Sequence, residues 1–118
     1  MALEEFKNAL DRTDEIELTV IGRKTGRQIT NPVWFVRDGD NLYLLPVKGS
    51  DSEWYKNVLQ NPTITLTANG VNWTTKAKPI TDATRVQDVV EQFRAKYGAD
   101  DVRKYYSKFD VAVEVPLA

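Results

Sequence analysis

The stretch IELTVIGRKTGRQITNPVWFVRDGDNLYLLPV, residues 16–47, carries the pattern that decides the fold. Apolar and polar residues alternate on both sides of a turn at 22–27, and a second turn signal, Arg-Asp-Gly-Asp-Asn, occupies 37–41. Alternation with a period of two, bounded by turn residues, is typical of β-strands joined by hairpins. The stretch therefore predicts three antiparallel strands, at 15–21, 28–36 and 42–47.

The second of these strands is partly apolar on both faces. Its residues alternate between the two faces, with Ile29, Val33 and Phe35 on one and Pro32, Trp34 and Val36 on the other. A strand of this kind forms the wall of a barrel whose outside is covered as well. The pattern leaves open whether a helix or a partner subunit provides that cover.

The rest of the chain predicts one more hairpin, four helices and a closing strand. Residues 63–68 alternate strictly and run into Asn69-Gly70, a strong hairpin signal. Ser52 and Asp82 each stand where a helix N-cap is expected, and Gly98 ends the longer helix. The predicted elements are helices at 3–10, 53–59, 83–97 and 100–108 and strands at 63–68, 71–78 and 111–115. Because strands come first and helices late, we predict an α+β fold, a barrel of mainly antiparallel strands with short helices packed on it, as a single domain over residues 1–118.

Composition narrows the function classes. The chain of 118 residues has no histidine and no cysteine, which removes the commonest general base, the usual zinc ligands and thiol chemistry, and no metal site is predicted. Its 16 Lys and Arg against 17 Asp and Glu give no basic excess of the kind that nucleic-acid binding needs. The acidic start lacks the pattern of a signal peptide, and no apolar run reaches membrane-spanning length. We therefore expect a cytoplasmic protein without an integral membrane segment.

Two loops have the chemistry of anion binding. Turn 22–27 combines two glycines, three cations and a threonine, so its backbone amides and arginines suit a phosphate. A solvated hairpin loop is the alternative. Segment 47–52 lies between a strand end and a helix N-terminus, where free amides and Lys48 favour an anion. The alternative there is that Ser52 caps the helix and Lys48 faces water. Two such loops in one small acidic protein favour a phosphorylated ligand.

Aromatic and amide side chains follow these loops. Trp34 and Trp54 suit the walls of a site for a planar ring, and core packing is the alternative for both. Asn31 and Asn57 lie near the same segments and are candidate donors to ring carbonyls. Three tyrosines near the C-terminus are candidates to cover a substrate cleft, with core packing again the alternative: Tyr97, Tyr105 and Tyr106.

The order of these motifs closely resembles the deazaflavin-dependent nitroreductase family. The likeness covers residues 16–68 and rests on five motifs: Gly22-Arg23-Lys24-Thr25-Gly26, a strand with Pro32 and Trp34, the Arg37-Asp38-Gly39 hairpin, Val47-Lys48-Gly49, and Trp54-Tyr55-Lys56-Asn57 followed by Asn61-Pro62. The resemblance implies a split β-barrel of the flavin-binding type. It also implies coenzyme F420 as the hydride carrier, with FMN as the alternative, and reduction of a quinone, a nitroaromatic or another conjugated acceptor.

The resemblance also assigns site residues. The phosphate and acidic tail of the cofactor would be held by Arg23, Lys24, Thr25, Arg27 and Lys48. The ring would be lined by Asn31, Pro32, Val33 and Trp34, with Val47, Gly49, Trp54 and Asn57 close by. No catalytic side chain is named, because a reduced deazaflavin supplies the hydride itself. The stretch between Gly49 and Trp54 is shorter than in the family's nitroreductases, which keeps FMN open as the cofactor.

Two other classes of function stay open. A non-catalytic or FMN-dependent split barrel would bind a flavin, a lipid or a tetrapyrrole. An interaction module would use the apolar outer face of the barrel, for example to form a homodimer. The resemblance favours an enzyme whose partner is a small-molecule electron acceptor.

Overall fold

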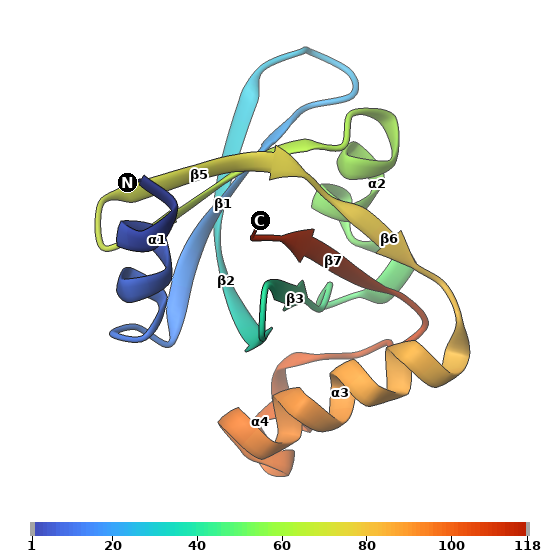
Figure 1. Cartoon of the computed structure of the whole chain (residues 1–118). Helices are drawn as coiled ribbons and strands as arrows, with labels where there is room; N and C mark the ends of the chain where they lie inside the picture. Colours follow the sequence, from blue (N-terminus) through green and yellow to red (C-terminus); the bar gives the residue numbers. More distant parts are fainter. Residues whose placement is uncertain (1, 118) are drawn as a thin grey trace.

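The computed structural model describes residues 2–117 and shows one antiparallel sheet of seven strands that curls into a partly open barrel (Figure 1). The strand order is β5-β4-β1-β2-β3-β7-β6. The elements are α1 (Ala2–Leu10), β1 (Glu15–Ile21), β2 (Gln28–Asp38), β3 (Asn41–Leu44), the 3-10 turn η1 (Gly49–Asp51), α2 (Glu53–Gln60), β4 (Thr63–Ala68), β5 (Val71–Lys76), β6 (Lys78–Ile80), α3 (Ala83–Tyr97), α4 (Ala99–Tyr105) and β7 (Ala112–Pro116). The predicted α+β class and the split barrel are confirmed.

Strand β2 belongs to both halves of this sheet. Its residues 28–34 pair with β1, whereas its residues 35–38 pair with β3. Within the described residues, no strand pairs with the 28–34 part on the side away from β1. The sheet is therefore split along β2, and the first part of this strand has a free edge.

The predicted strand at 71–78 is wrong as one element, because the chain changes sides at Ala77. Strand β5 pairs with β4, whereas β6 pairs with β7 at the other edge of the sheet. The Ala77 N–H donates to the Pro62 carbonyl at 2.8 Å, which breaks the ladder at the corner. Figure 1 shows the continuous β5–β6 ribbon crossing from one half of the barrel to the other. Trp73 on β5 donates from Nε1 to the Pro116 carbonyl on β7 at 3.2 Å, which ties edge strand β5 to the other half of the sheet.

Two predicted elements are shorter in the structure than the sequence pattern suggests. Strand β3 ends at Leu44 instead of residue 47, since Pro46 has no N–H to continue a ladder. Helix α4 ends at Tyr105 instead of residue 108, because Ser107 donates its N–H to the Val47 carbonyl at 2.8 Å. Both changes have one consequence: the segment after β3 and the segment after α4 lie against each other.

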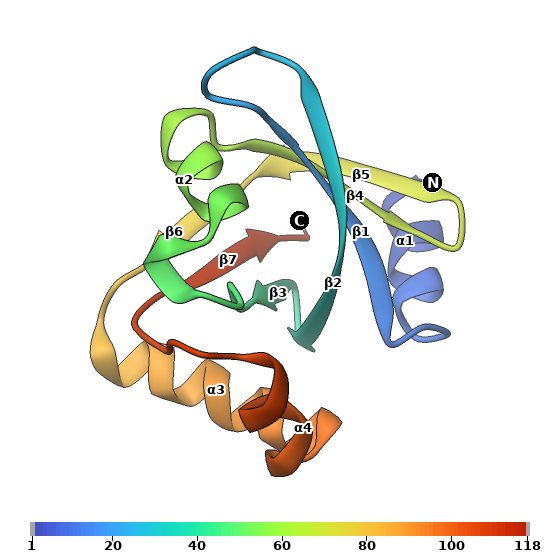
Figure 2. The same ribbon diagram turned by 180° about the vertical axis from the view of Figure 1, so that it is seen from behind.

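Apolar residues form two cores, one on each side of β2. Ile16, Leu18 and Phe35 belong to the core inside the barrel. Val36 belongs to a second core between the sheet and helices α3 and α4, which include Phe93. Figure 2 shows α3 and α4 together at one end of the sheet. The chain's own helices thus cover the outer face of β2 at Trp34 and Val36, whereas Pro32 on the same face stays exposed. None of the helices in residues 2–117 has the length and apolar character needed to cross a membrane.

Candidate cofactor and acceptor cleft

A cleft of about 630 Å³ opens at the free edge of β2. One wall is β2 itself, and the facing wall is the segment that runs from the end of β3 to the start of α2. The C-terminal end of α4 completes it. The lining residues are Glu15, Asn31, Pro32, Val33, Trp34, Leu45, Val47, Lys48, Asp51, Ser52, Glu53, Trp54, Tyr105 and Tyr106.

The structure brings part of the predicted site together. The predicted residues that line the cleft are Asn31, Pro32, Val33, Trp34, Val47, Lys48, Trp54, Tyr105 and Tyr106. Those outside its lining are Arg23, Lys24, Thr25, Arg27, Gly49, Asn57 and Tyr97. The lining residues that sequence reasoning missed are Glu15, Leu45, Asp51, Ser52 and Glu53.

The aromatic wall of the cleft is built around Trp34. Tyr97 stacks on its indole with ring centroids 4.2 Å apart and an interplanar angle of 9°. Tyr105 meets the same indole edge-on at 5.5 Å and remains 51% exposed. Stacked and edge-on arrangements are the favourable geometries for aromatic pairs. Trp34 is therefore held by other rings and presents a fixed apolar surface to a planar ligand.

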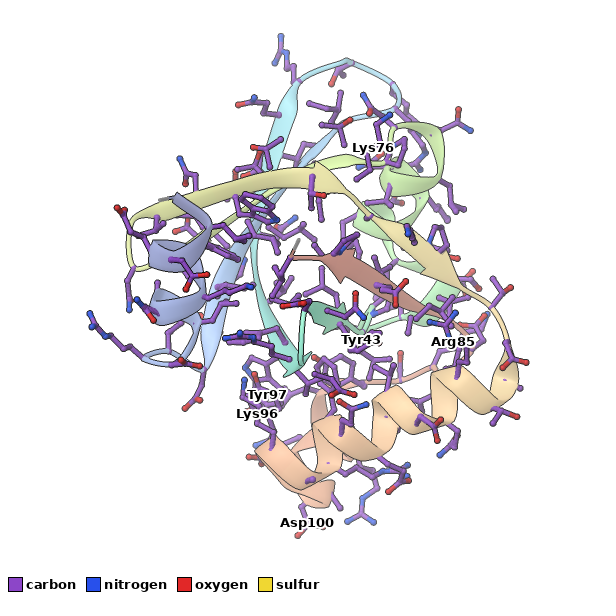
Figure 3. All side chains as sticks on the ribbon, viewed as in Figure 1. Tyr43, Lys76, Arg85, Lys96, Tyr97 and Asp100 are labelled. Carbon is purple, nitrogen blue, oxygen red and sulfur yellow. The ribbon has the colours of Figure 1, made fainter. Side chains whose placement is uncertain are left out.

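Tyr97 lies behind this wall and extends the β1–β2 ladder where β1 begins. Its hydroxyl accepts from the Phe35 N–H at 3.0 Å and lies 2.7 Å from the Asp14 carbonyl and 2.9 Å from the Phe35 carbonyl, to either of which it donates. Figure 3 shows Tyr97 and Lys96 at the end of α3, beside the end of β2. Burial raises the pKa of Tyr97 to about 12, and the charges of Asp14 and Glu15 add to this, against the opposing hydrogen bond to Phe35.

Replacing Tyr97 with Phe is expected to destabilise the protein by about 1–3 kcal/mol at neutral pH, because main-chain groups at the strand end lose their partner. The raised pKa adds a second signature. The hydroxyl is protonated in the folded protein up to a pKa of about 12, whereas in the unfolded chain it ionises near the ordinary tyrosine pKa of 10.0. Its contribution to stability is therefore present below pH 10 and is lost as the pH rises toward 12. Urea unfolding between pH 7 and pH 12 measures both effects.

Tyr105→Phe is the matched control for this substitution. Its hydroxyl makes no hydrogen bond within residues 2–117, and its ring is half exposed, so the free energy of unfolding should change little. Equal losses in the two variants would contradict the role given to the Tyr97 hydroxyl. The steeper loss of wild-type stability above pH 10 should be reduced in the Tyr97 variant alone.

Tyr106 stands between the second core and the cleft. Its side chain is only 6% exposed, yet it lines the cleft. Its hydroxyl has no hydrogen-bond partner in the described part of the chain, and no fully buried side-chain nitrogen or oxygen there is unpaired. The hydroxyl therefore reaches solvent at the cleft. Burial, followed by the neighbouring Tyr97, raises the pKa of Tyr106 further above physiological pH, where a tyrosine hydroxyl is protonated and can donate.

The Lys48 loop is fixed by the segment after α4. Asp110 accepts from the main-chain N–H and the hydroxyl of Ser50, and Lys108 pairs with Asp51 at 3.1 Å. Although partial desolvation opposes the shift, the hydrogen bonds from Ser50 and the charge of Lys108 hold the pKa of Asp110 below its usual value. Gly49 has a φ of 55°, and a Cβ atom there would lie 2.1 Å from Asp110 Oδ1. These contacts hold Lys48 at the cleft, and they require a residue without a side chain at position 49.

Ser52 differs from the prediction that it caps α2 with its side chain. It is the N-cap residue, but its hydroxyl makes no capping bond and instead accepts from the Lys48 N–H at 2.8 Å. The physical reason is the preceding 3-10 turn, which brings the Lys48 amide to this hydroxyl. The start of α2 lines the cleft, and Lys48 makes no ion pair within residues 2–117.

The basic turn at 22–27 is partly engaged with the protein itself. Arg23 donates from Nη2 to Glu53 Oε2 at 2.7 Å, and from Nη1 and its main-chain N–H to Asn57 Oδ1 at 2.8 and 3.1 Å. The hydrogen bond and charge of Arg23 lower the pKa of Glu53. These contacts fasten the turn to α2. Lys24, Thr25 and Arg27 are exposed beyond this attachment.

Comparison with known proteins adds a family match. The model of the F420H(2)-dependent quinone reductase family matches residues 4–117. A solved F420-H2 dependent reductase, FDR-A, is 19% identical with a TM-score of 0.67, covering 86% of this chain and 93% of that one. A structure described as a domain-swapped dimer is 16% identical with a TM-score of 0.68, covering 95% and 94%. The haem storage protein HutZ from Vibrio cholerae is 14% identical with a TM-score of 0.70, covering 96% and 87%. At these identities the structural likeness establishes the fold.

Proposed function

The chain belongs to the F420H(2)-dependent quinone reductase family, and from this membership we propose that it transfers a hydride from reduced F420 to a quinone, a nitroaromatic or another conjugated acceptor. Family membership supports F420 as the cofactor and reduction as the reaction. The cleft carries the proposal further, because it combines aromatic walls with a cation in its lining, Lys48, which makes no ion pair within residues 2–117. We place this activity in the cytoplasm.

The residues of the cleft fit a phosphorylated deazaflavin. Trp34 and Trp54 offer apolar surfaces to a planar ring, and Asn31 offers an amide that donates and accepts hydrogen bonds. Lys48 lies beside the N-terminus of α2, so an ammonium group and helix amides serve the same anion. The 630 Å³ of the cleft is in the range of ligand pockets. We propose that Lys24 and Arg27, which lie outside the lining, contact only the acidic tail where it leaves the cleft.

The chemistry divides between cofactor and protein. When bound, reduced F420 supplies a hydride, which carries two electrons and one proton. Trp34 and Trp54 hold the ring plane and keep water away from it. Tyr106 donates a hydrogen bond from its protonated hydroxyl to an oxygen of the acceptor, at the position where negative charge develops. The second proton that a quinone needs to become a hydroquinone comes from water.

Titration of the purified protein with F420 and, separately, with FMN tests the proposal. Quenching of tryptophan fluorescence reports binding, and loss of F420H2 absorbance with 2-methyl-1,4-naphthoquinone reports turnover. We expect F420 to bind more tightly than FMN and the quinone to be reduced. Binding without turnover would support the alternative of a non-catalytic barrel, and binding of neither cofactor would contradict the proposed reaction. Light scattering on the same sample measures the homodimer that we propose from the likeness to a domain-swapped dimer.

A further inference from the structure

Two charges that line the cleft have no ionic partner in the described part of the chain. Four charged side chains line it, of which Asp51 pairs with Lys108 and Glu53 pairs with Arg23. The two that remain are Lys48 and Glu15. They come from different walls, Lys48 from the loop before α2 and Glu15 from the start of β1. The cleft therefore presents one positive and one negative group to whatever enters it.

Glu15 lies beside the aromatic wall. It is the residue directly opposite Trp34 in the β1–β2 register, and opposite residues of an antiparallel pair project from the same face. Its side chain is exposed, so its carboxylate is available to a ligand that lies against Trp34 and Tyr105. The nearby cation of α3, Lys96, is engaged elsewhere, because its Nζ donates to the Phe35 carbonyl at 2.8 Å and sits 3.5 Å from the Phe35 ring centroid. Glu15 therefore has no direct ionic partner at the aromatic wall within residues 2–117.

We propose that Glu15 sets the charge preference for the acceptor, so that the cleft takes neutral or cationic planar acceptors and rejects those that carry a sulfonate or carboxylate. The inference rests on the proposed function, since it assigns the phosphate of the cofactor to Lys48, the cofactor ring to Trp34 and Trp54, and the acceptor to the part of the cleft beside Glu15 and Tyr105. An anionic acceptor would place its charge near that of Glu15, where the low-dielectric walls strengthen repulsion. A cationic ring gains from the carboxylate and from the aromatic faces together.

The test compares two acceptors in three proteins. The acceptors are neutral 2-methyl-1,4-naphthoquinone and anionic 1,4-naphthoquinone-2-sulfonate, and the proteins are wild type, Glu15→Gln and Glu17→Gln. Glu17 is the matched control, because it projects from the same face of β1 two residues further on and does not line the main cleft. We expect Glu15→Gln to raise kcat/KM for the sulfonate by about three- to tenfold and to change that for the neutral quinone less than twofold. Since each acceptor is compared with itself across the three proteins, the different redox potentials of the two quinones cancel.

A binding measurement without cofactor separates this inference from the proposed reaction. Naphthalene-2-sulfonate, which is not reducible here, is titrated into each protein while tryptophan fluorescence is followed. The dissociation constant should fall by a similar factor in Glu15→Gln, stay unchanged in Glu17→Gln, and differ less between proteins in 0.5 M salt because salt screens the charge. If no protein reduces either quinone, the proposed function fails while the binding result still decides the charge preference. Equal effects of the two substitutions, no effect of Glu15→Gln, or no binding of the sulfonate to any of the proteins would overturn the inference.

Discussion

Gly49→Ala is expected to destabilise the protein by about 2–5 kcal/mol and to weaken cofactor binding with it. Two effects add. The φ of 55° at this position lies in the left-handed region, which strains any residue with a side chain. The new Cβ atom would also lie 2.1 Å from Asp110 Oδ1, so the carboxylate or the loop must move. Because Asp110 holds Ser50, the displacement passes into the loop that carries Lys48. Urea unfolding monitored by fluorescence gives the loss directly.

Gly39→Ala separates the two effects. Gly39 has a φ of 62°, close to that of Gly49, but a Cβ atom there would meet nothing within 4 Å. It should show only the backbone strain, on the order of 1 kcal/mol, and leave the affinity for F420 unchanged. If the two alanine variants lose the same free energy of unfolding, the close approach to Asp110 is not what requires a glycine at position 49.

Lys48→Ala is expected to raise the dissociation constant for F420 by about 10- to 100-fold while leaving the free energy of unfolding nearly unchanged. The factor corresponds to loss of one charge-assisted hydrogen bond of about 1.5–3 kcal/mol to an anion. Stability should be retained because the Lys48 side chain is exposed and makes no ion pair within the described residues. Fluorescence titration of F420 at low and high salt measures the effect, which should shrink as salt screens the charge.

Arg27→Ala and Lys24→Ala serve as the comparison for this substitution. Both cations are exposed in the 22–27 turn and lie outside the cleft lining, so each should weaken F420 binding less than Lys48→Ala does. Their effect should also grow with the length of the acidic tail. A larger loss in Arg27→Ala than in Lys48→Ala would place the phosphate at the turn and contradict the assignment to Lys48.

Strands with a local alternation of apolar and polar residues could be predicted from the sequence. The point at which the chain leaves one neighbouring strand and pairs with another could not. The bounds of β1 and β4 match their predicted ranges, because each strand has one buried and one less buried face. The division at Ala77 depends on the carbonyl of Pro62, which no local pattern reveals. The end of β3 could have been predicted from Pro46, because proline has no N–H with which to continue a ladder.

The candidate site shows the same division. Its apolar wall of Trp34, Val47 and Trp54 follows from residue type and order. A glycine is required at position 49 because of its positive φ and its close approach to Asp110, which the sequence motif does not reveal. Arg23 and Asn57 hydrogen-bond to each other, so their contact with a cofactor stays a prediction. Glu15 was missed because it looked like an ordinary solvent-facing strand residue. The available signal was its register: an antiparallel hairpin centred on 22–27 places residue 15 opposite residue 34.

The free edge of β2 has a consequence for solubility. An open strand edge is a template on which another chain can add a strand, and repeated addition leads to aggregation. The Phe35 N–H and carbonyl point toward Tyr97 on the β1 side, so by alternation along the strand Pro32 turns its nitrogen toward the open edge. That nitrogen carries no hydrogen, and an incoming strand would find no donor there. Pro32, which lines the cleft, thus also opposes the addition of another strand at this edge.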